Sequence, residues 1–517
     1  MSIQISGRAL SQVDRNSERY GYLREVHHAI AAKNPATWGE AAAAEAAIRL
    51  NWVDLPEQSP RLRSDVEALV QRFKERPRVV LCGMGGSSLA PEVLAKSFQR
   101  QLVVVDSTDP NYLAHALAGD LAKTVFVVSS KSGSTIETAS QRSFFEAALR
   151  EAGLNPIDHF VFVTDPDSPL DRDVRSLGHA VINADPNVGG RFSALSAFGI
   201  VPAALAGIDI WSVVTDAADA KRAFLAQDEV ILDAAYLLST VAGQYLAFTD
   251  QGSKVPGLAD WIEQLIAEST GKDGKGRLPI AVESVANGAV GGAFTISFAE
   301  SDGDLNVIAP LGAHFIFWEW VTAIVGAALA IDPFNQPNVT EAKEQTLALL
   351  AQWKGDSGTH IPVSSPDAVD GAVEIFGAGT DIKSALAEII KASKADGYFA
   401  IMAYLDRKDD VELEQLRAIL AAKADRPTTF GWGPRFLHST GQFHKAGQPN
   451  GSFIQITGDF DSDLEIPGRD FTFGTLIRAQ ALGDGATLQK RKYPLVRFHC
   501  KDRAAGIAQI IKAANEL

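Results

Sequence analysis

Five short apolar runs between residues 78 and 183 constrain the fold of this 517-residue chain more than any other feature. The runs are rich in β-branched residues, apolar throughout rather than alternating, and separated by segments with helical patterns. They occupy residues 78–81, 102–105, 125–128, 160–163 and 180–183. Strands of this kind are typical of parallel sheets with helices on both faces. The sequence therefore predicts an α/β protein with a doubly wound parallel sheet.

The rest of the chain predicts three further parts. Residues 1–75 have helical patterns, and further strand candidates lie at 278–282, 293–298, 305–308, 398–405, 453–456 and 495–499. A mostly helical stretch is expected at 208–270, two long helices at 313–331 and 338–353, and a boundary loop at 355–371. We expect an N-terminal helical extension over 1–75, a first domain over 76–207, a second over 208–370 and a C-terminal α/β unit over 371–517.

Composition excludes several classes of protein. A net charge of −15 with no Lys/Arg run argues against nucleic acid as a partner. Two cysteines, Cys82 and Cys500, cannot form a disulfide framework, and no signal peptide is recognisable, which favours the cytoplasm. The apolar run at 315–331 contains Glu319 and is shorter than the roughly 20 residues of a membrane span. It is expected to be a buried core helix.

A hydroxyl-rich segment, Ser-Lys-Ser-Gly-Ser-Thr-Ile-Glu-Thr at 130–138, follows the third predicted strand. Its candidate ligand-binding side chains are Ser130, Lys131, Ser132, Ser134, Thr135 and Thr138. Hydroxyls and backbone N–H groups at a helix N-terminus can hold a phosphoryl group. A helix cap alone would explain one hydroxyl, but not five. The segment therefore predicts a site for a small phosphorylated molecule.

A glycine cluster, Gly-Met-Gly-Gly-Ser at 83–87, follows the first predicted strand. One interpretation is a dinucleotide fingerprint with Asp106 as the ribose-binding acid, although Ser88 replaces its third glycine. The alternative places Gly85, Gly86 and Ser87 beside the hydroxyl-rich segment, around one sugar phosphate at the carboxyl edge of the sheet. We favour the second interpretation, because the hydroxyls have no part in a dinucleotide site.

An arginine follows another glycine pair in Asn-Val-Gly-Gly-Arg-Phe-Ser at 187–193. Arg191 could be a solvated loop charge. Beside a phosphate site, it could instead stabilise an oxyanion.

These three motifs together resemble phosphoglucose isomerase, a family with the sugar isomerase (SIS) fold. Two further stretches agree. Residues 261–276 are similar to the segment that carries the family's catalytic glutamate, which falls on Glu268. Residues 334–343 are similar to the segment that ends in the family's active-site lysine, and this lysine falls on Lys343. The same segment includes Gln336, which is expected to be a further substrate contact. The resemblance covers about 75–345 and is strongest to the isomerase half of bifunctional transaldolase and phosphoglucose isomerase proteins, but no stretch is long enough for an aldolase barrel.

The histidine of the family motif is displaced in this chain. His314 is the only histidine between Glu268 and Lys343, and its surroundings do not match. Phe-Leu-His-Ser-Thr-Gly-Gln at 436–442 does resemble the motif, so the ring-opening histidine is placed at His438, with His444 as the fallback. The C-terminal unit would then supply part of the site.

The resemblance implies two SIS domains and a glucose-6-phosphate isomerase of glycolysis and gluconeogenesis that uses no cofactor and no metal. The implied roles are proton shuttling by Glu268, enediolate stabilisation by Arg191, and ring opening by His438 with Lys343. His27 and His28 are expected on a helix surface rather than in a metal site. Two alternatives stay open, namely an isomerase that also accepts mannose 6-phosphate and a non-catalytic sugar-phosphate sensor. A homodimer is suggested but not predicted by any pattern.

Overall fold

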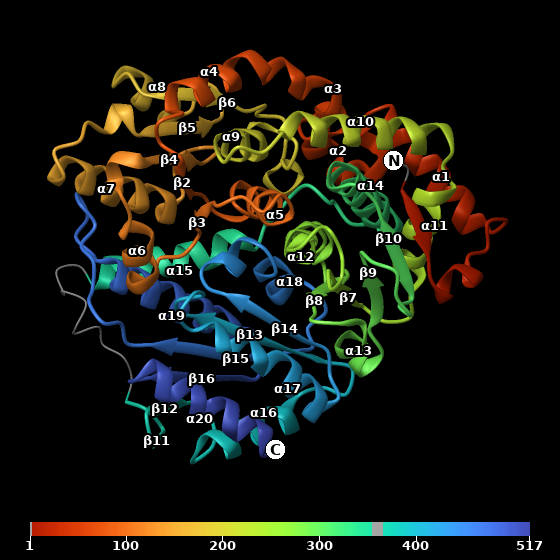
Figure 1. Cartoon of the computed structure of the whole chain (residues 1–517). Coiled ribbons are helices and arrows are strands. Elements are labelled where there is room, and N and C mark those ends of the chain that lie inside the picture. The colour runs from red at the N-terminus through yellow and green to blue at the C-terminus, as the bar shows by residue number, and fades with distance from the viewer. Residues whose placement is uncertain (1–2, 354–364) are drawn as a thin grey trace.

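Three sheets form the framework of the protein (Figure 1). The computed structural model describes residues 3–353 and 365–517. The first sheet has the order β3-β2-β4-β5-β6, and all its strands are parallel. Its strands are β2 (Arg78–Cys82), β3 (Val103–Val105), β4 (Thr124–Ser129), β5 (Phe160–Thr164) and β6 (Ala180–Asn183). These are the five strands that the apolar runs predicted, so the expected doubly wound sheet is confirmed.

Helices cover both faces of the first sheet because its strands are apolar on both sides. Val79 and Leu81 belong to one apolar core, whereas Val80 and Cys82 belong to another on the opposite face. The associated helices are α5 (Leu89–Ser97), α6 (Pro110–Leu117), α7 (Ile136–Glu151), α8 (Pro169–Ser176) and α9 (Ala197–Leu205). The carboxyl ends of the strands are left free for loops, and the glycine-rich and hydroxyl-rich motifs follow β2 and β4 there.

The second sheet has the order β1-β10-β9-β7-β8, and only its edge strand β1 runs antiparallel. Its strands are β1 (Gln4–Ser6), β7 (Tyr245–Thr249), β8 (Leu278–Ala281), β9 (Phe294–Ser297) and β10 (Leu305–Ile308). The surrounding helices are α10 (Ile210–Ala226), α11 (Glu229–Thr240), α12 (Leu258–Thr270), α13 (Val285–Gly288) and α14 (Leu311–Ala328). Strand β7 lies inside the stretch expected to be helical, so that part of the prediction was wrong.

Helix α14 is the one helix in the described part of the chain that is long and apolar enough to cross a membrane. In the structure 94% of it is buried, and Glu319 lies fully inside the protein. Desolvation raises the pKa of Glu319 well above its usual value. The helix is therefore a core element of the second sheet's helical layer, as its interruption by a glutamate indicated.

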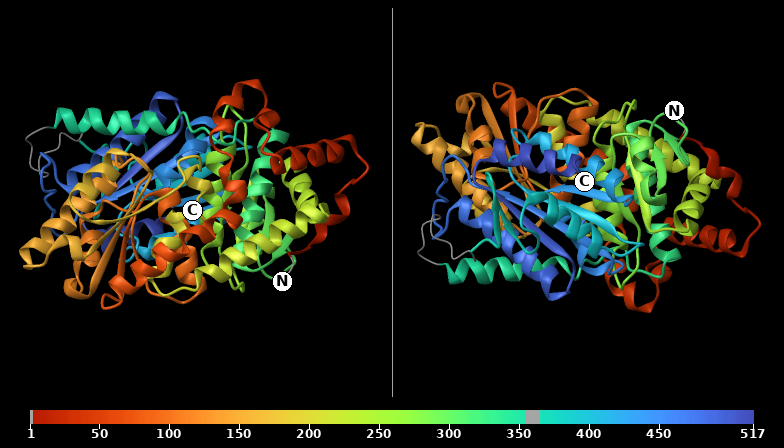
Figure 2. Two further views of the ribbon diagram at one scale, coloured as in Figure 1. Left: turned by 90° about the horizontal axis from the view of Figure 1, so that it is seen from above. Right: turned by 90° about the horizontal axis from the view of Figure 1, so that it is seen from below.

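The N-terminal segment packs against both sheets. It contains α1 (Glu18–Ala31), α2 (Glu40–Ala47), α3 (Leu55–Gln58) and α4 (Arg63–Phe73). Helix α1 contacts α11 and α14, whereas α4 contacts α9, and Figure 2 shows the red helices at the start of the chain beside the green second sheet. His27 is buried rather than on the surface, because its Nδ1 accepts a hydrogen bond from the Trp320 indole at 3.0 Å. His28 is exposed, as expected.

The C-terminal sheet has the order β11-β12-β16-β15-β13-β14, in which the last four strands are parallel. Its strands are β11 (Ala368–Asp370), β12 (Val373–Phe376), β13 (Tyr398–Tyr404), β14 (Thr428–Trp432), β15 (Gly451–Gly458) and β16 (Leu495–Cys500). Its helices are α16 (Ile382–Ala392), α17 (Gln415–Ala424), α18 (Gly441–Ala446), α19 (Phe473–Lys490) and α20 (Arg503–Asn515). Most of the expected loop at 355–371 lies outside the described residues, and its end forms the β11–β12 hairpin.

Buried charges join the C-terminal unit to the first sheet. The Glu92 carboxylate on α5 receives Arg407 Nη1 at 2.9 Å and Arg435 Nη1 at 2.7 Å. Burial alone would raise the pKa of Glu92, but the two guanidinium groups hold it well below its usual value. Helix α15 (Val339–Gln352) also packs along α19, which places both helices beside the first sheet. Segments far apart in the sequence therefore meet at the carboxyl edge of this sheet.

Candidate active site

Helix α12 is the central element of the site and lies where the three sheets meet (Figure 1). Every residue of the helix except Asp260 is buried, because its neighbours surround it on all sides. It carries Gln264 and Glu268 four positions apart, so their side chains lie on the same face. Both polar side chains are consequently held among fixed neighbours.

Glu268 and Arg191 form a buried ion pair. Arg191 belongs to the short 3-10 helix η8 (Gly190–Phe192), and its Nη1 lies 3.4 Å from Glu268 Oε1. The two side chains are only 3% and 10% exposed, so the pair is shielded from bulk water. The Lys272 amine lies close by, and desolvation and the Arg191 charge favour its neutral form by holding its pKa well below its usual value. The carboxylate thus faces positive charge in a dry setting.

The remaining donors of Arg191 are all engaged. Its Nε donates to Ser269 Oγ at 2.8 Å, and its Nη1 donates to Gln336 Oε1 at 2.9 Å. Its Nη2 donates to the carbonyl oxygens of Pro333 and Asn335. These bonds fix the plane of the guanidinium and bring the 334–343 motif to the Glu268 pair.

Gln264 connects Glu268 to the histidine segment. Its Nε2 donates to Glu268 Oε2 at 3.1 Å and to the His438 carbonyl at 2.8 Å. Gly85, with φ of 55°, approaches so closely that a Cβ there would lie 2.8 Å from Gln264 Nε2. The glycine motif after β2 therefore packs directly against this connection.

His438 ends the 3-10 helix η11 (Arg435–His438) and pairs with Glu137. Its Nε2 lies 3.1 Å from Glu137 Oε1, which also accepts a hydrogen bond from Gln480 Nε2 at 2.7 Å. Burial acts to raise the pKa of Glu137, but His438 and nearby Lys343 hold it below its usual value. Glu137 thus stays ionised and orients the imidazole.

A cavity of about 150 Å³ opens beside this pair. Lys343 and His438 line it, and so do Ser134 and Thr135 at the start of α7. Arg191 and Glu268 do not line this cavity; they are joined to it through Gln264. Hydrogen bonds through Gln264 thus join the Arg191–Glu268 pair to the His438 backbone, and Lys343 lines the same cavity as the His438 side chain.

The structure divides the predicted hydroxyl-rich cradle. Ser132 Oγ lies 2.6 Å from Ser134 Oγ at the cavity mouth. Ser130 and Thr138 instead line a second cavity of about 180 Å³. Lys131 turns away to form an ion pair with Asp165 at 3.0 Å. Only part of the segment is thus placed to hold a ligand beside His438.

The other glycines of the first motif make room for backbone packing. A Cβ on Gly86 would lie 1.9 Å from the Gly190 carbonyl oxygen, so η5 (Gly85–Ser87) can pack on η8 only with glycine there. This contact positions Arg191. Ser87 is half-buried beside it. Asp106 is buried within ion-pair distance of Arg407 and Arg435, an environment unlike that of a free ribose-binding acid.

The other candidate histidines lie in apolar cores. His444 is buried, its Nδ1 lies 2.9 Å from the Tyr398 hydroxyl, and burial lowers its pKa to about 3. His314 is fully enclosed on α14 with its pKa also lowered to about 3 by burial. Neither neighbours the Glu268 pair, so His438 is the histidine that the fold brings to the site.

One group in the described part of the chain could hold a metal ion. His115, Asp406 and Asp409 place one ligand atom each within 4.8 Å of one another. His115 Nε2 lies 2.6 Å from Asp409 Oδ2, so this group also forms an ion pair. None of the three lines the His438 cavity.

Part of the chain is similar in sequence to known proteins. Residues 61–273 match the family model for phosphoglucose isomerase. Glucose-6-phosphate isomerase of Campylobacter jejuni is 34% identical over 235 residues, which cover 43% of this chain and 57% of that protein. A glucose-6-phosphate isomerase of Thermus thermophilus is 32% identical over 287 residues, which cover 52% of this chain and 65% of that protein.

A solved structure of a glucose-6-phosphate isomerase from Chlamydia trachomatis shares the fold, with a TM-score of 0.54 and 20% sequence identity. The likeness covers 68% of this chain and 88% of that one. The chain spans little more than half the length of the first relatives that it matches. The matched segment contains Arg191 and Glu268, whereas Lys343 and His438 lie beyond it. Over residues 61–273, which include Arg191 and Glu268, the chain is therefore similar to the phosphoglucose isomerase family.

Proposed function

We propose that the protein is a glucose-6-phosphate isomerase that interconverts glucose 6-phosphate and fructose 6-phosphate without a metal or cofactor. The observation that supports this most is the buried Arg191–Glu268 pair, connected through Gln264 to the His438–Glu137 pair. One pair suits proton transfer between carbons, and the other suits opening of a sugar ring.

Glu268 is proposed as the base that moves a proton between C1 and C2 of the open-chain sugar. Aldose–ketose isomerisation passes through a cis-enediolate, whose negative charge needs a fixed cation beside its oxygens. Arg191 is held by four protein acceptors and so needs little reorganisation when that charge develops.

Ring opening is proposed to use His438 and Lys343, which line the same cavity. Proton transfer at the ring oxygen and the C1 hydroxyl requires a group that can both accept and donate near neutral pH, and histidine does so. Glu137 acts through His438, because its carboxylate contacts the imidazole and fixes the orientation of the ring.

Ser134 and Thr135 are proposed as phosphate contacts at the N-terminus of α7. Replacing both by alanine should raise KM by about tenfold or more and change kcat much less, because a remote phosphate mainly contributes binding energy. Steady-state kinetics with glucose 6-phosphate measure this effect. Ser176→Ala, at an exposed position on α8, is the matched control. An unchanged KM in the double variant would remove these hydroxyls from the site.

His438→Asn should slow turnover of cyclic glucose 6-phosphate more than reaction of the open-chain form, because only the cyclic sugar needs ring opening. The comparison uses the same enzyme preparation with an aldose phosphate whose hydroxyl groups cannot close a ring as the open-chain substrate. His444→Asn should show no such selectivity, since His444 lies in the C-terminal core. Selectivity in the His444 variant instead would move the role to that residue.

A coupled assay with glucose 6-phosphate and mannose 6-phosphate in parallel, with a chelator present, tests the proposed activity. We expect turnover of glucose 6-phosphate that is insensitive to the chelator. Sugar-phosphate binding without turnover would favour a sensor, and comparable turnover of mannose 6-phosphate would favour a dual isomerase. We further propose a cytoplasmic location, a place in glycolysis and gluconeogenesis, and a homodimer, which sedimentation velocity would test.

A further inference from the structure

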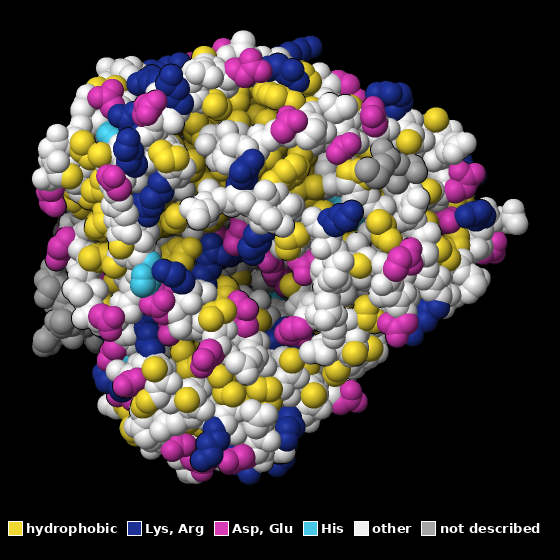
Figure 3. All heavy atoms as spheres, viewed as in Figure 1, with side chains coloured by type: hydrophobic (Ala, Val, Ile, Leu, Met, Phe, Trp, Pro, Cys, Tyr) yellow, Lys and Arg dark blue, Asp and Glu magenta, His cyan; other side chains and the backbone are white. Residues whose placement is uncertain are grey.

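A larger cavity of about 560 Å³ is lined in part by α12 and η11 and shares no lining residue with the His438 cavity. Figure 3 shows a hollow near the middle of the face seen in Figure 1, where basic and acidic side chains gather. Its walls come from α5, α12, the C-terminal sheet and the segment after β8. None of the residues assigned to the isomerase site lines it. The volume falls in the range of small-molecule sites rather than of single ions.

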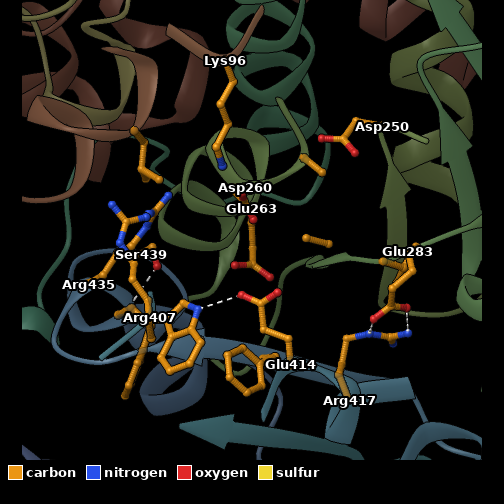
Figure 4. A pocket seen from close by; sticks show the side chains of 18 of the residues that line it. Lys96, Asp250, Asp260, Glu263, Glu283, Arg407, Glu414, Arg417, Arg435 and Ser439 are labelled. Carbon is orange, nitrogen blue, oxygen red and sulfur yellow. Dashed lines mark hydrogen bonds and ion pairs between the residues drawn. The ribbon is translucent and has the colours of Figure 1, made fainter. Parts of the chain in front are cut away.

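Four of the five basic side chains that line this cavity already have carboxylate partners, and the fifth, Lys408, is exposed. Arg407 and Arg435 share Glu92 and Asp106, and Lys96 lies 3.3 Å from Glu92. Arg417 is paired with Glu283, as the dashed lines in Figure 4 show. This wall therefore has little positive charge left for an anionic ligand.

The acidic wall lacks such compensation. Asp260, Glu263 and Glu414 form no direct ion pair with a described cation, although the more distant charges of Arg435 act on Glu263 and those of Lys96 and Arg407 act on Glu414. Glu263 is only 9% exposed, and its Oε1 is buried without any hydrogen-bond partner. Figure 4 shows its carboxylate pointing into the cavity toward that of Glu414. A buried carboxylate oxygen without a hydrogen-bond donor is costly.

Aromatic rings flank these carboxylates. Trp432 and Phe430 line the cavity with their rings 5.0 Å apart, and Trp432 Nε1 donates to Glu414 Oε1 at 2.9 Å. Carboxylates beside aromatic faces are the combination that binds organic cations, through charge and cation–π attraction. A bare metal ion fits less well, since no three described carboxylates of this cavity bring ligand atoms within 4.8 Å of one another.

We propose that this cavity binds an organic ammonium ion, a primary amine or diamine, whose charged group is held by Glu263 and Glu414 beside Trp432. A molecule bound in this cavity would contact α12 at Glu263, one residue before Gln264. It would also lie beside Ser439, the residue that follows His438. The two cavities thus share the elements that carry the isomerase residues.

Ionisation of Glu263 gives the binding a pH dependence. Burial and the Asp260 charge raise the pKa of Glu263 to about 8, whereas the Ala281 backbone and Arg435 oppose this shift. At pH 6.5 the bound cation must displace a proton from the Glu263 carboxyl group, whereas at pH 8.5 this group is already largely ionised. Affinity should therefore rise with pH across this interval. The other charged groups of the cavity are Lys96, Asp250, Asp260, Glu283, Arg407, Lys408, Glu414, Arg417 and Arg435.

Isothermal titration calorimetry of the full chain with butane-1,4-diamine at constant ionic strength tests the proposal. We expect one site per chain, tighter binding at pH 8.5 than at pH 6.5, and no binding of butane-1,4-diol. Glu263→Gln should weaken binding at least tenfold and abolish the pH dependence. Glu414→Gln, at an exposed position that cannot disrupt the core, should also weaken it.

Glu388→Gln, on an exposed face of α16, is the matched control and should bind like the unmodified chain. Thermal unfolding of each variant shows that the fold is intact. Three results would each overturn the proposal. They are unchanged affinity for the diamine in both Glu263→Gln and Glu414→Gln, a loss of affinity in Glu388→Gln as large as in those two variants, and binding of the diol. Because the readout is heat of binding and not turnover, its failure leaves the proposed isomerase activity untouched.

Discussion

Glu268→Gln should lower kcat by about a thousandfold, because a positioned general base contributes roughly that factor and the amide cannot accept the proton. Sugar-phosphate binding should be nearly unchanged, since glutamine keeps the shape of the side chain and its contact with Gln264. The coupled isomerase assay gives the rate, and calorimetric titration with fructose 6-phosphate gives the affinity. A large loss of kcat with unchanged affinity would indicate that Glu268 acts as a base, whereas a structural carboxylate would affect both quantities.

Glu67→Gln, on the exposed face of α4, is the control for this substitution and should behave like the unmodified enzyme. Retention of full turnover by Glu268→Gln would refute the assignment of the base. Loss of both binding and turnover, with a lowered unfolding temperature, would instead point to a role in holding Arg191.

Arg191→Lys should reduce kcat by about a hundredfold or more, although the positive charge is kept. Lysine cannot reproduce the planar fork that contacts Ser269, Gln336 and two backbone carbonyls, so the charge would no longer be held beside the developing enediolate. Stability should fall as well, because buried acceptors lose their donors. The assay and thermal unfolding measure the two effects.

Arg277→Lys provides the matched control. Arg277 is buried and donates to the carbonyls of Leu238, Ser239 and Gly243. Its replacement by lysine therefore removes about as many guanidinium hydrogen bonds as the Arg191 substitution does. It should lower the unfolding temperature while leaving kcat nearly unchanged. Equal losses of kcat in the two variants would mean that Arg191 acts through stability alone.

The first sheet was predictable because its strands are apolar on both faces and short relative to the helices between them. Strands β1 and β7 could not be predicted from the sequence. The three residues of β1 form a strand only through pairing with β10, a partner about 300 positions away. Strand β7 has the sequence Tyr-Leu-Ala-Phe-Thr, whose leucine and alanine suit a helix equally well, so tertiary pairing decides its conformation.

The site was predictable only where residues fall in motifs. Arg191 and Glu268 lie in motifs, and the fold brings them together. Glu137 also lies in one, but a glutamate at the start of a helix gives no sign that it faces His438, because its partner comes from another unit. Gln480 lies on α19 in no motif at all. The ion pair between Lys131 and Asp165 was likewise not predictable, because it depends on the conformation of a loop that no local sequence pattern indicates.

The location of His438 and Gln480 in the last third of the chain has a consequence for biosynthesis. A ribosome releases the segment with Arg191 and Glu268 well before the strands on either side of η11 exist. The nascent polypeptide therefore carries the pair that we propose for proton transfer before the histidine that we propose for ring opening has been made. Such an intermediate would be catalytically silent toward cyclic sugars until the final sheet docks through Arg407 and Arg435. Maturation of activity should therefore lag behind folding of the amino-terminal half.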